Sequence, residues 1–171
     1  MKKSILVLGL SLVLLLTFGI NVQAQGKEGI ETGTTTYYVT SKVLPVGQGI
    51  IYMSYEAIGT TVSDTGGGLF HNATARVLGG INIEKGVWKD ERGWGVYNLQ
   101  NGDKVFFKFT AVGEAKPGGA GLAKGTGAIT GGTGKAAGIQ GSIELNRTIV
   151  RSAIEGVGQS YSKDTIKYTL P

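Results

Sequence analysis

The sequence has 171 residues, with 17 lysines and arginines against 12 aspartates and glutamates, no cysteine and one histidine. The lack of cysteine excludes a disulfide framework, a thiol nucleophile and a cysteine-linked lipid anchor, and the scattered basic residues form no stripe typical of nucleic-acid binding. A single histidine without cysteine gives no ligand spacing for zinc, so we expect neither a metal nor a cofactor.

Residues 1–24 have the pattern of a secretory signal peptide. Lys2 and Lys3 precede an apolar run from Ile5 to Ile20, and Val22-Gln23-Ala24 is a small-x-small cleavage site. A membrane anchor, the alternative, usually needs about 20 apolar residues. We therefore predict a cleaved chain that starts at Gln25, is secreted or periplasmic and has no stable membrane anchor. The 147 residues that follow the 24-residue leader are enough for one domain with its own core.

We expect residues 25–33 to form a flexible leader and residues 34–171 to form one all-β domain. Thr34–Thr40 is β-branched and aromatic, and Ile50–Ile58 alternates between apolar and polar residues, as a strand does. Leu69–Ile83 is predicted as one long strand, in which the Gly79-Gly80 pair marks a bulge or bend.

The second half of the domain gives the clearest strand. Asn101-Gly102 predicts a type I′ hairpin turn, because both residues tolerate positive φ. In Lys104–Val112, Val105, Phe107 and Phe109 share one face, which we expect to point inward, while Lys108 points to solvent. The other expected strands are Val87–Leu99, Gly121–Ile129, Ile139–Arg147 and Thr165–Leu170. About eight strands result, and we predict a single antiparallel β-barrel, because closure removes exposed strand edges.

A glycine-rich stretch from Gly125 to Gly141 connects two of these strands. A phosphate loop would need a Gly-Lys-Ser/Thr ending, but Ala136 follows Gly134-Lys135. We therefore interpret the stretch as a structural turn. The segment Ile129–Lys135, with Gly138 and Gly141, resembles the allene oxide cyclase barrel superfamily, which includes the dirigent proteins and secreted bacterial proteins of unknown function. The Asn101-Gly102-Asp103 turn and the apolar strand after it are similar as well, and the resemblance implies a fold rather than an activity.

The candidate ligand-binding residues are Tyr52, Glu56, Trp94 and Tyr97, which place aromatic rings and one carboxylate on predicted strands. Glu56, like Glu84, would act as an acid or base if its face pointed into the barrel. We favour the alternative, in which Ile51, Met53 and Tyr55 point inward and Glu56 faces solvent.

Two other chemical interpretations are weaker. His71 is the only histidine and no G-x-S-x-G motif occurs, so a serine triad has no support. Asp90-Glu91 lies between Lys89 and Arg92, and we interpret this run as a solvated charged turn.

Two functions stay open at the level of sequence. The favoured one is a secreted module that binds a small apolar ligand or a partner without catalysis. The alternative is a cofactor-free isomerase or cyclase that acts on a small apolar substrate in the barrel cavity, as the resemblance permits. Whether a carboxylate faces an enclosed apolar cavity separates the two. Catalytic residues are not assigned, and a homo-oligomer is compatible with either function.

Overall fold

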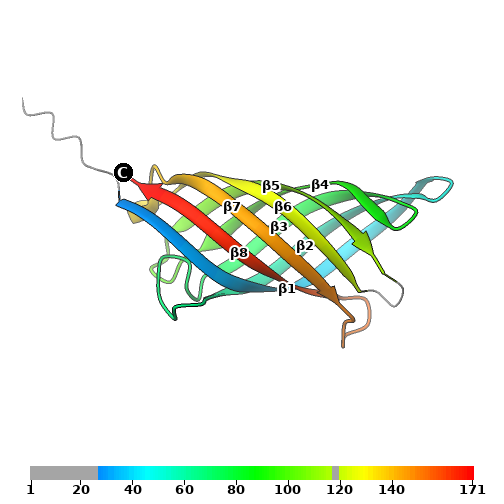
Figure 1. Ribbon diagram of the computed structural model, residues 1–171, viewed down its shortest axis with the longest axis horizontal. Coiled ribbons are helices and arrows are strands. Elements are labelled where there is room, and N and C mark those ends of the chain that lie inside the picture. Colours follow the sequence, from blue (N-terminus) through cyan, green and yellow to red (C-terminus); the bar gives the residue numbers. More distant parts are fainter. Residues whose placement is uncertain (1–26, 117–119) are drawn as a thin grey trace, which may run out of the picture.

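The fold is a closed β-barrel in which each strand pairs with the next in antiparallel orientation and β8 pairs with β1 (Figure 1). The computed structural model describes residues 27–116 and 120–171. Its strands are β1 (Lys27–Gly47), β2 (Ile50–Ser63), β3 (Thr74–Glu84), β4 (Val87–Asn98), β5 (Lys104–Ala115), β6 (Gly121–Gly132), β7 (Gln140–Val150) and β8 (Gly158–Leu170). The predicted fold class is confirmed. Within these described ranges, no helix is long and apolar enough to cross a membrane.

The first strand begins earlier than the sequence indicates. Residues 27–33, expected to form part of a flexible leader, belong to β1, and Lys27 pairs with Leu170 of β8. The expectation was wrong because a polar segment can still form a strand. The backbone of residues 27–33 pairs with β8, whose edge would otherwise have no partner. The predicted signal peptide and the residues Gln25 and Gly26 lie outside the described residues.

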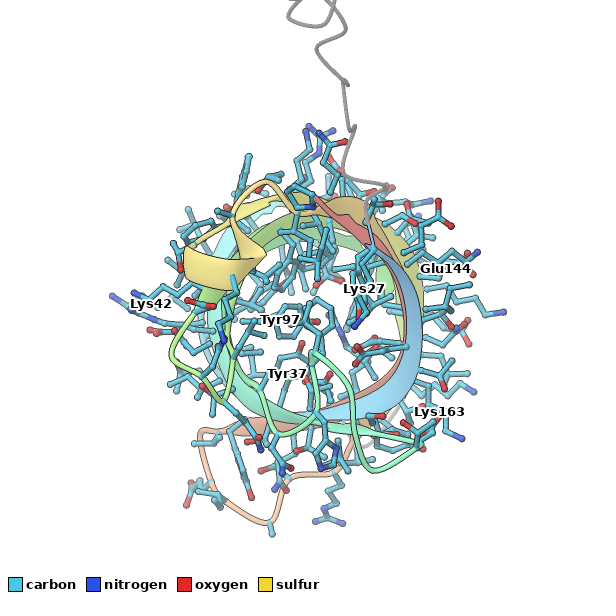
Figure 2. All side chains as sticks on the ribbon, turned by 90° about the vertical axis from the view of Figure 1, so that its left-hand side faces the viewer. Lys27, Tyr37, Lys42, Tyr97, Glu144 and Lys163 are labelled. Atoms are coloured by element: carbon cyan, nitrogen blue, oxygen red, sulfur yellow. The ribbon has the colours of Figure 1, made fainter. Side chains whose placement is uncertain are left out.

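Side chains alternate between the interior and the surface along most of each strand, although residues 40–47 at the end of β1 are all exposed. Val105, Phe107 and Phe109 of β5 are buried, and Lys108 faces out, as predicted. On β2, Tyr55 and Ala57 are buried. In the view along the barrel axis, the rings of Tyr37 and Tyr97 lie inside the wall, whereas Lys42, Glu144 and Lys163 point away from it (Figure 2).

One end of the barrel is sealed by the loop of residues 64–73. Glu31 accepts hydrogen bonds from the backbone N–H groups of Leu69 (2.6 Å) and Phe70 (3.0 Å) and from the Tyr168 hydroxyl (2.9 Å). Phe70 is 1% exposed and packs edge-on against Tyr97 and Tyr168. The predicted strand Leu69–Ile83 was therefore wrong in its first part, because its apolar residues plug the barrel and β3 begins only at Thr74.

The glycine pair of β3 is not a bulge. Gly79 and Gly80 keep regular pairing with β2, and the register shift between β3 and β4 falls between Asn82 and Ile83. A side chain at Gly79 would collide with the ring of Tyr55, and one at Gly80 with the ring of Tyr52. These glycines therefore make space for aromatic rings on the neighbouring strand, which is a common use of strand glycine.

The Asn101-Gly102 turn connects β4 and β5, but it is not of type I′. Gly102 has a φ of 86°, whereas Asn101 is not among the residues with positive φ. The Gly102 N–H donates to the Leu99 carbonyl (3.0 Å) and the Leu99 N–H to the Asp103 carbonyl (2.8 Å). This geometry is a type I turn followed by a glycine bulge, which needs only one residue with positive φ.

The glycine-rich stretch connects β6 to β7 through a 3₁₀ turn, Gly134–Ala136. Gly134 has a φ of 55°, and the Lys135 N–H donates a hydrogen bond of 2.9 Å to Oδ2 of Asp103. A side-chain carboxylate of the protein itself thus occupies the position that a phosphate would take beside the Gly-Lys pair. This contact supports the structural interpretation of the stretch.

Candidate functional site

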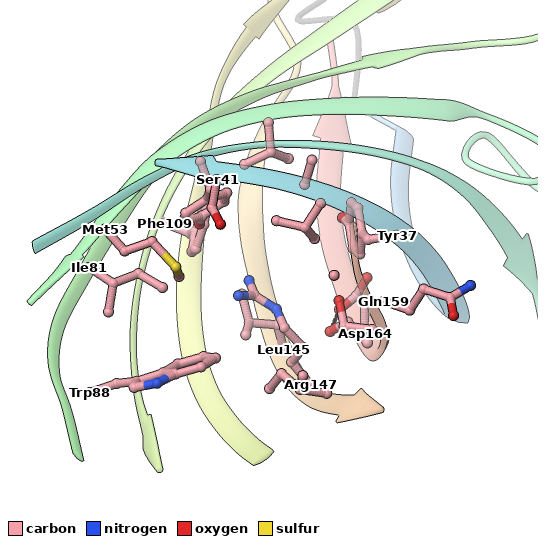
Figure 3. Close-up of a pocket in the computed structure, with 18 of the residues that line it drawn as sticks. Tyr37, Ser41, Met53, Ile81, Trp88, Phe109, Leu145, Arg147, Gln159 and Asp164 are labelled. Carbon is pink, nitrogen blue, oxygen red and sulfur yellow. Dashed lines mark hydrogen bonds between the residues drawn. The ribbon is translucent and has the colours of Figure 1, made fainter. Parts of the chain in front are cut away.

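A cavity of about 160 Å³ lies inside the barrel, in the half opposite the sealing loop. It opens toward the end that carries the β1–β2, β3–β4 and β7–β8 turns. The walls combine aliphatic and aromatic side chains with a few polar ones (Figure 3). The lining residues are Tyr37, Val39, Ser41, Met53, Tyr55, Ala57, Val77, Ile81, Trp88, Tyr97, Phe107, Phe109, Ile143, Leu145, Arg147, Ile149, Gly158, Gln159, Ser160, Ser162 and Asp164.

Aromatic rings on β4 and β5 form one part of the wall. The rings of Tyr97 and Phe107 stack with centroids 4.7 Å apart, and Phe109 lies next to Phe107 at 6.4 Å. Gly93 and Gly95 on β4 leave the space that Phe109 and Phe107 fill, because a Cβ at either glycine would collide with the ring opposite. The small residues of one strand thus fix the orientation of the large residues on the next.

A buried ion pair lies beside this aromatic wall. Nη1 of Arg147 on β7 donates a hydrogen bond of 2.6 Å to Oε1 of Glu91 on β4, and the two side chains are 14% and 0% exposed. The guanidinium carbon is 5.6 Å from the ring centroid of Phe109, a cation–π contact. Burial lowers the pKa of Arg147, but the charge and hydrogen bond of Glu91, together with the nearby Tyr55 and Tyr37, outweigh burial and raise the pKa, so Arg147 stays charged.

Tyr55 completes this cluster. Its hydroxyl donates a hydrogen bond of 2.5 Å to the same Oε1 atom of Glu91. Burial and the neighbouring Glu91 charge raise the pKa of Tyr55 far above its ordinary value. The cluster therefore holds one positive charge, one negative charge and one neutral hydroxyl. The second carboxylate oxygen of Glu91, Oε2, is buried without a hydrogen-bond partner among the described residues.

A second buried carboxyl group, that of Asp164 on β8, belongs to the cavity lining, which does not include Glu91. Its Oδ2 accepts a hydrogen bond from the Thr35 hydroxyl (2.8 Å) and its Oδ1 accepts one from the Ser162 hydroxyl (2.5 Å). Burial raises the pKa of Asp164 above its ordinary value of 3.8, against the opposing effect of both hydrogen bonds and the more distant Arg147. Asp164 is therefore the cavity-lining carboxyl best suited to hold or release a proton.

The four residues chosen from the sequence do not come together. Tyr97 lines the cavity, but Tyr52 and Trp94 lie on the outer surface, 40% and 64% exposed. Glu56 also points outward, as the favoured interpretation expected, and pairs with Arg76 at 2.6 Å. Glu84 is exposed at the end of β3. None of these four outward-facing residues can contact a molecule inside the barrel.

The structure also shows where His71 and the Asp90-Glu91 run lie relative to the cavity. His71 lies in the sealing loop, where its Nδ1 accepts a hydrogen bond of 3.3 Å from the Ser63 N–H, outside the cavity lining. The solvated charged turn predicted at Asp90-Glu91 was wrong, since β4 runs through both residues and Glu91 is fully buried. An irregularity between Trp88 and Glu91 in the β4–β5 register shifts the alternation and turns Glu91 inward.

The positions of the charged cavity residues within their strands are a sequence signal for an inward orientation. Arg147 lies in phase with Ile143 and Leu145 on β7, and Asp164 lies in phase with Ile166 on β8. A charged residue in the apolar phase of a strand indicates a polar group inside a barrel. In the ranges that the structure describes, no group of three or more histidines and carboxylates could hold a metal ion.

Comparisons with protein-family models, with curated proteins and with solved structures found no match to this chain.

Proposed function

We propose that the protein is a secreted or periplasmic β-barrel module that binds a small, mainly apolar ligand in the barrel cavity, without catalysis. The observation that carries this proposal is the cavity of about 160 Å³, walled by aromatic and aliphatic side chains and open at one end. Apolar concave sites with a few fixed polar groups are the usual form of small-molecule sites. The segment Ile129–Lys135, with Gly138 and Gly141, resembles the allene oxide cyclase barrel superfamily. On the basis of this resemblance we also propose that the protein is a member of that superfamily.

The size of the cavity limits the ligand. A closed apolar cavity of about 150 Å³ accommodates one benzene molecule. A cavity of about 160 Å³ therefore holds a single ring or a short chain, and a longer ligand would extend through the open end. We expect the bound part of the ligand to have roughly ten non-hydrogen atoms or fewer.

A cavity-filling substitution tests the binding site. Ser160 lines the cavity and is 8% exposed, so Ser160→Phe should fill it. The matched control is Ser142→Phe, which places the same ring on the outer face of β7. We expect native mass spectrometry to detect a copurified or added one-ring ligand on the parent protein and on Ser142→Phe, but not on Ser160→Phe. Equal binding by Ser160→Phe and Ser142→Phe would refute the site.

A cofactor-free isomerase or cyclase is the second candidate, and one observation favours it. Asp164 places a carboxyl group in the wall of the apolar cavity, which is the feature that a proton-transfer enzyme requires. We expect such an enzyme to exchange the α-protons of cyclohexanone for deuterium in D₂O, and Asp164→Asn should abolish the exchange. Binding of the ketone without exchange would leave the binding module as the function.

The export proposal has its own test. N-terminal sequencing of the protein recovered from outside the cytoplasm should start at Gln25. Recovery of a chain that retains Met1 in the membrane fraction would contradict it.

A further inference from the structure

The guanidinium of Arg147 has donor capacity that the described residues do not use. An arginine side chain carries five N–H donors. Among the described residues, its one hydrogen bond is the 2.6 Å contact of Nη1 with Glu91. The side chain lines the cavity and keeps 14% exposure, so the remaining donors can reach a molecule there (Figure 3).

A second donor without a partner belongs to Trp88, a cavity-lining residue, but this N–H group is shielded from the cavity. Trp88 is 8% exposed, and its indole N–H is buried without a hydrogen-bond partner among the described residues. An indole nitrogen can only donate. Buried donors of this kind are rare, because leaving one without an acceptor costs free energy. Of the two donor groups, only the Arg147 guanidinium keeps exposure to the cavity, so its free donors indicate a ligand that carries an acceptor atom.

The charges around the cavity restrict what that acceptor can be. The single positive charge of Arg147 is already balanced by Glu91, and Asp164 adds a further carboxyl group. Tyr37, Tyr55 and Tyr97 stay neutral, because burial raises the pKa of each hydroxyl. A ligand carboxylate bound to Arg147 would thus share this one cation with Glu91, in a cavity whose lining already holds the Asp164 carboxyl group. Burying a charge without its own partner is strongly unfavourable.

We propose that the cavity selects an uncharged ligand that carries a hydrogen-bond acceptor, such as a ketone or aldehyde carbonyl, which Arg147 binds, and that it discriminates against carboxylates. This inference rests on the proposed function, because it assumes that the cavity is the binding site. Glu91 sets the selectivity by cancelling the charge of Arg147 while it holds the guanidinium in place. A ligand without an acceptor atom would leave the Arg147 donors without hydrogen bonds. It is therefore rejected because of these unsatisfied donors and not because of its charge.

Four probes of one ring size test the proposal by calorimetric titration. Acetophenone has a neutral carbonyl, benzoate a carboxylate, benzylamine an ammonium group and toluene no polar group. We expect acetophenone to bind at least tenfold more tightly than each of the other three at neutral pH. Benzoate should be the weakest, because it brings a second negative charge next to Glu91.

Two variants separate charge from hydrogen bonding. Glu91→Gln removes the counter-charge of Arg147, so the affinity for benzoate should rise at least tenfold relative to that for acetophenone. The double variant Glu91→Met with Arg147→Met replaces the ion pair by apolar side chains, an exchange that folded proteins often tolerate. It should bind toluene and acetophenone with similar affinity. If Glu91→Gln does not fold, the ranking of the four probes on the unaltered protein still decides the question.

The outcomes distinguish the selectivity from the site itself. If no probe binds, the proposed function fails together with this inference. If toluene binds as tightly as acetophenone, or if benzoate or benzylamine binds most tightly, the selectivity proposal is overturned while ligand binding in the cavity stands. An unchanged ranking in Glu91→Gln would also overturn it, because Glu91 would then have no part in the choice of ligand.

Discussion

Phe107 combines burial with a fixed position in the cavity wall. It is 4% exposed, and its ring stacks on Tyr97 at 4.7 Å. We expect Phe107→Ala to lower the free energy of unfolding by about 3–5 kcal/mol, because the lost contacts leave a larger void. Phe106→Ala on the outer face, where the ring is 39% exposed, is the matched control and should cost much less. Denaturant melts measure both, and equal losses would contradict the assigned faces.

Glu56 should matter little to stability. Its ion pair with Arg76 lies on the surface, with side chains 36% and 61% exposed. Exposed ion pairs contribute little, so Glu56→Gln should change the free energy of unfolding by no more than about 0.5 kcal/mol. A strongly shifted denaturant midpoint would contradict this prediction, because it would show that Glu56 contributes more to stability than an exposed ion pair does.

Asp164 should give the protein a characteristic pH dependence. Because burial raises the pKa of its carboxyl group in the folded protein, the proton binds more tightly to the folded state than to the unfolded one. The resulting contribution to stability is full below the ordinary pKa of 3.8 and is lost as the pH rises through the raised value.

Replacing Asp164 by asparagine should remove that loss. The stability of Asp164→Asn relative to the unaltered protein should therefore increase as the pH rises from about 3 and then level off above the raised pKa. Urea melts at a series of pH values measure the difference. A relative stability that falls with rising pH would show that the ionised carboxylate stabilises the fold.

At the scale of single elements, the β6–β7 connection depends on Gly134. Its φ of 55° is unfavourable for residues with a side chain, and a Cβ there would collide with the Asp103 carboxylate. We expect Gly134→Val to cost about 1–3 kcal/mol of stability. Gly67→Val is the control, because a Cβ at Gly67 meets no atom within 4 Å. Thermal melts that respond equally to both variants would show that the turn is not strained.

The strands could be predicted from the sequence where the interior is purely apolar. The alternation in β2 and β5 gave the correct faces because Tyr55, Ala57, Phe107 and Phe109 occupy consecutive inward positions. The same rule failed for residues 69–73, because a loop that plugs a barrel needs apolar side chains just as a strand does.

The polar part of the cavity could not be found in the same way. Glu91 turns inward only because the β4–β5 register is irregular, and a period of two residues does not predict that shift. Arg147 and Asp164 do occupy inward positions in the alternation of their strands. From the sequence alone, however, a charged residue is assigned to the solvent-facing side of a strand unless its partner is known. The partners lie 56 residues away for Arg147 and 129 for Asp164, so only the closed barrel brings them together.

At the scale of the whole molecule, the N-terminal end of β1 and the C-terminal end of β8 lie side by side, because Lys27 pairs with Leu170. A circular permutant that joins these ends and opens the chain between Glu155 and Gly156 should fold, since that break falls in an exposed turn. We expect a single cooperative denaturation transition and an unchanged far-ultraviolet circular dichroism spectrum. A control chain that ends at Val157 lacks β8 and should show no cooperative transition. Failure of the permutant alone would mean that the native order of strands is required.

The seam between β1 and β8, which runs from the Lys27–Leu170 pair to the Val39–Gly158 pair, has a consequence for synthesis. A ribosome releases β1 first and β8 last, so one edge of β1 has no partner until roughly 130 further residues have been made, which at 5–20 residues per second takes on the order of ten seconds. During that time the edge is a template on which another nascent chain can pair. Behind the proposed signal peptide, β1 also crosses the membrane before β8, so the rate at which the chain emerges, rather than the rate of folding, sets how long the new protein must be kept apart from its copies.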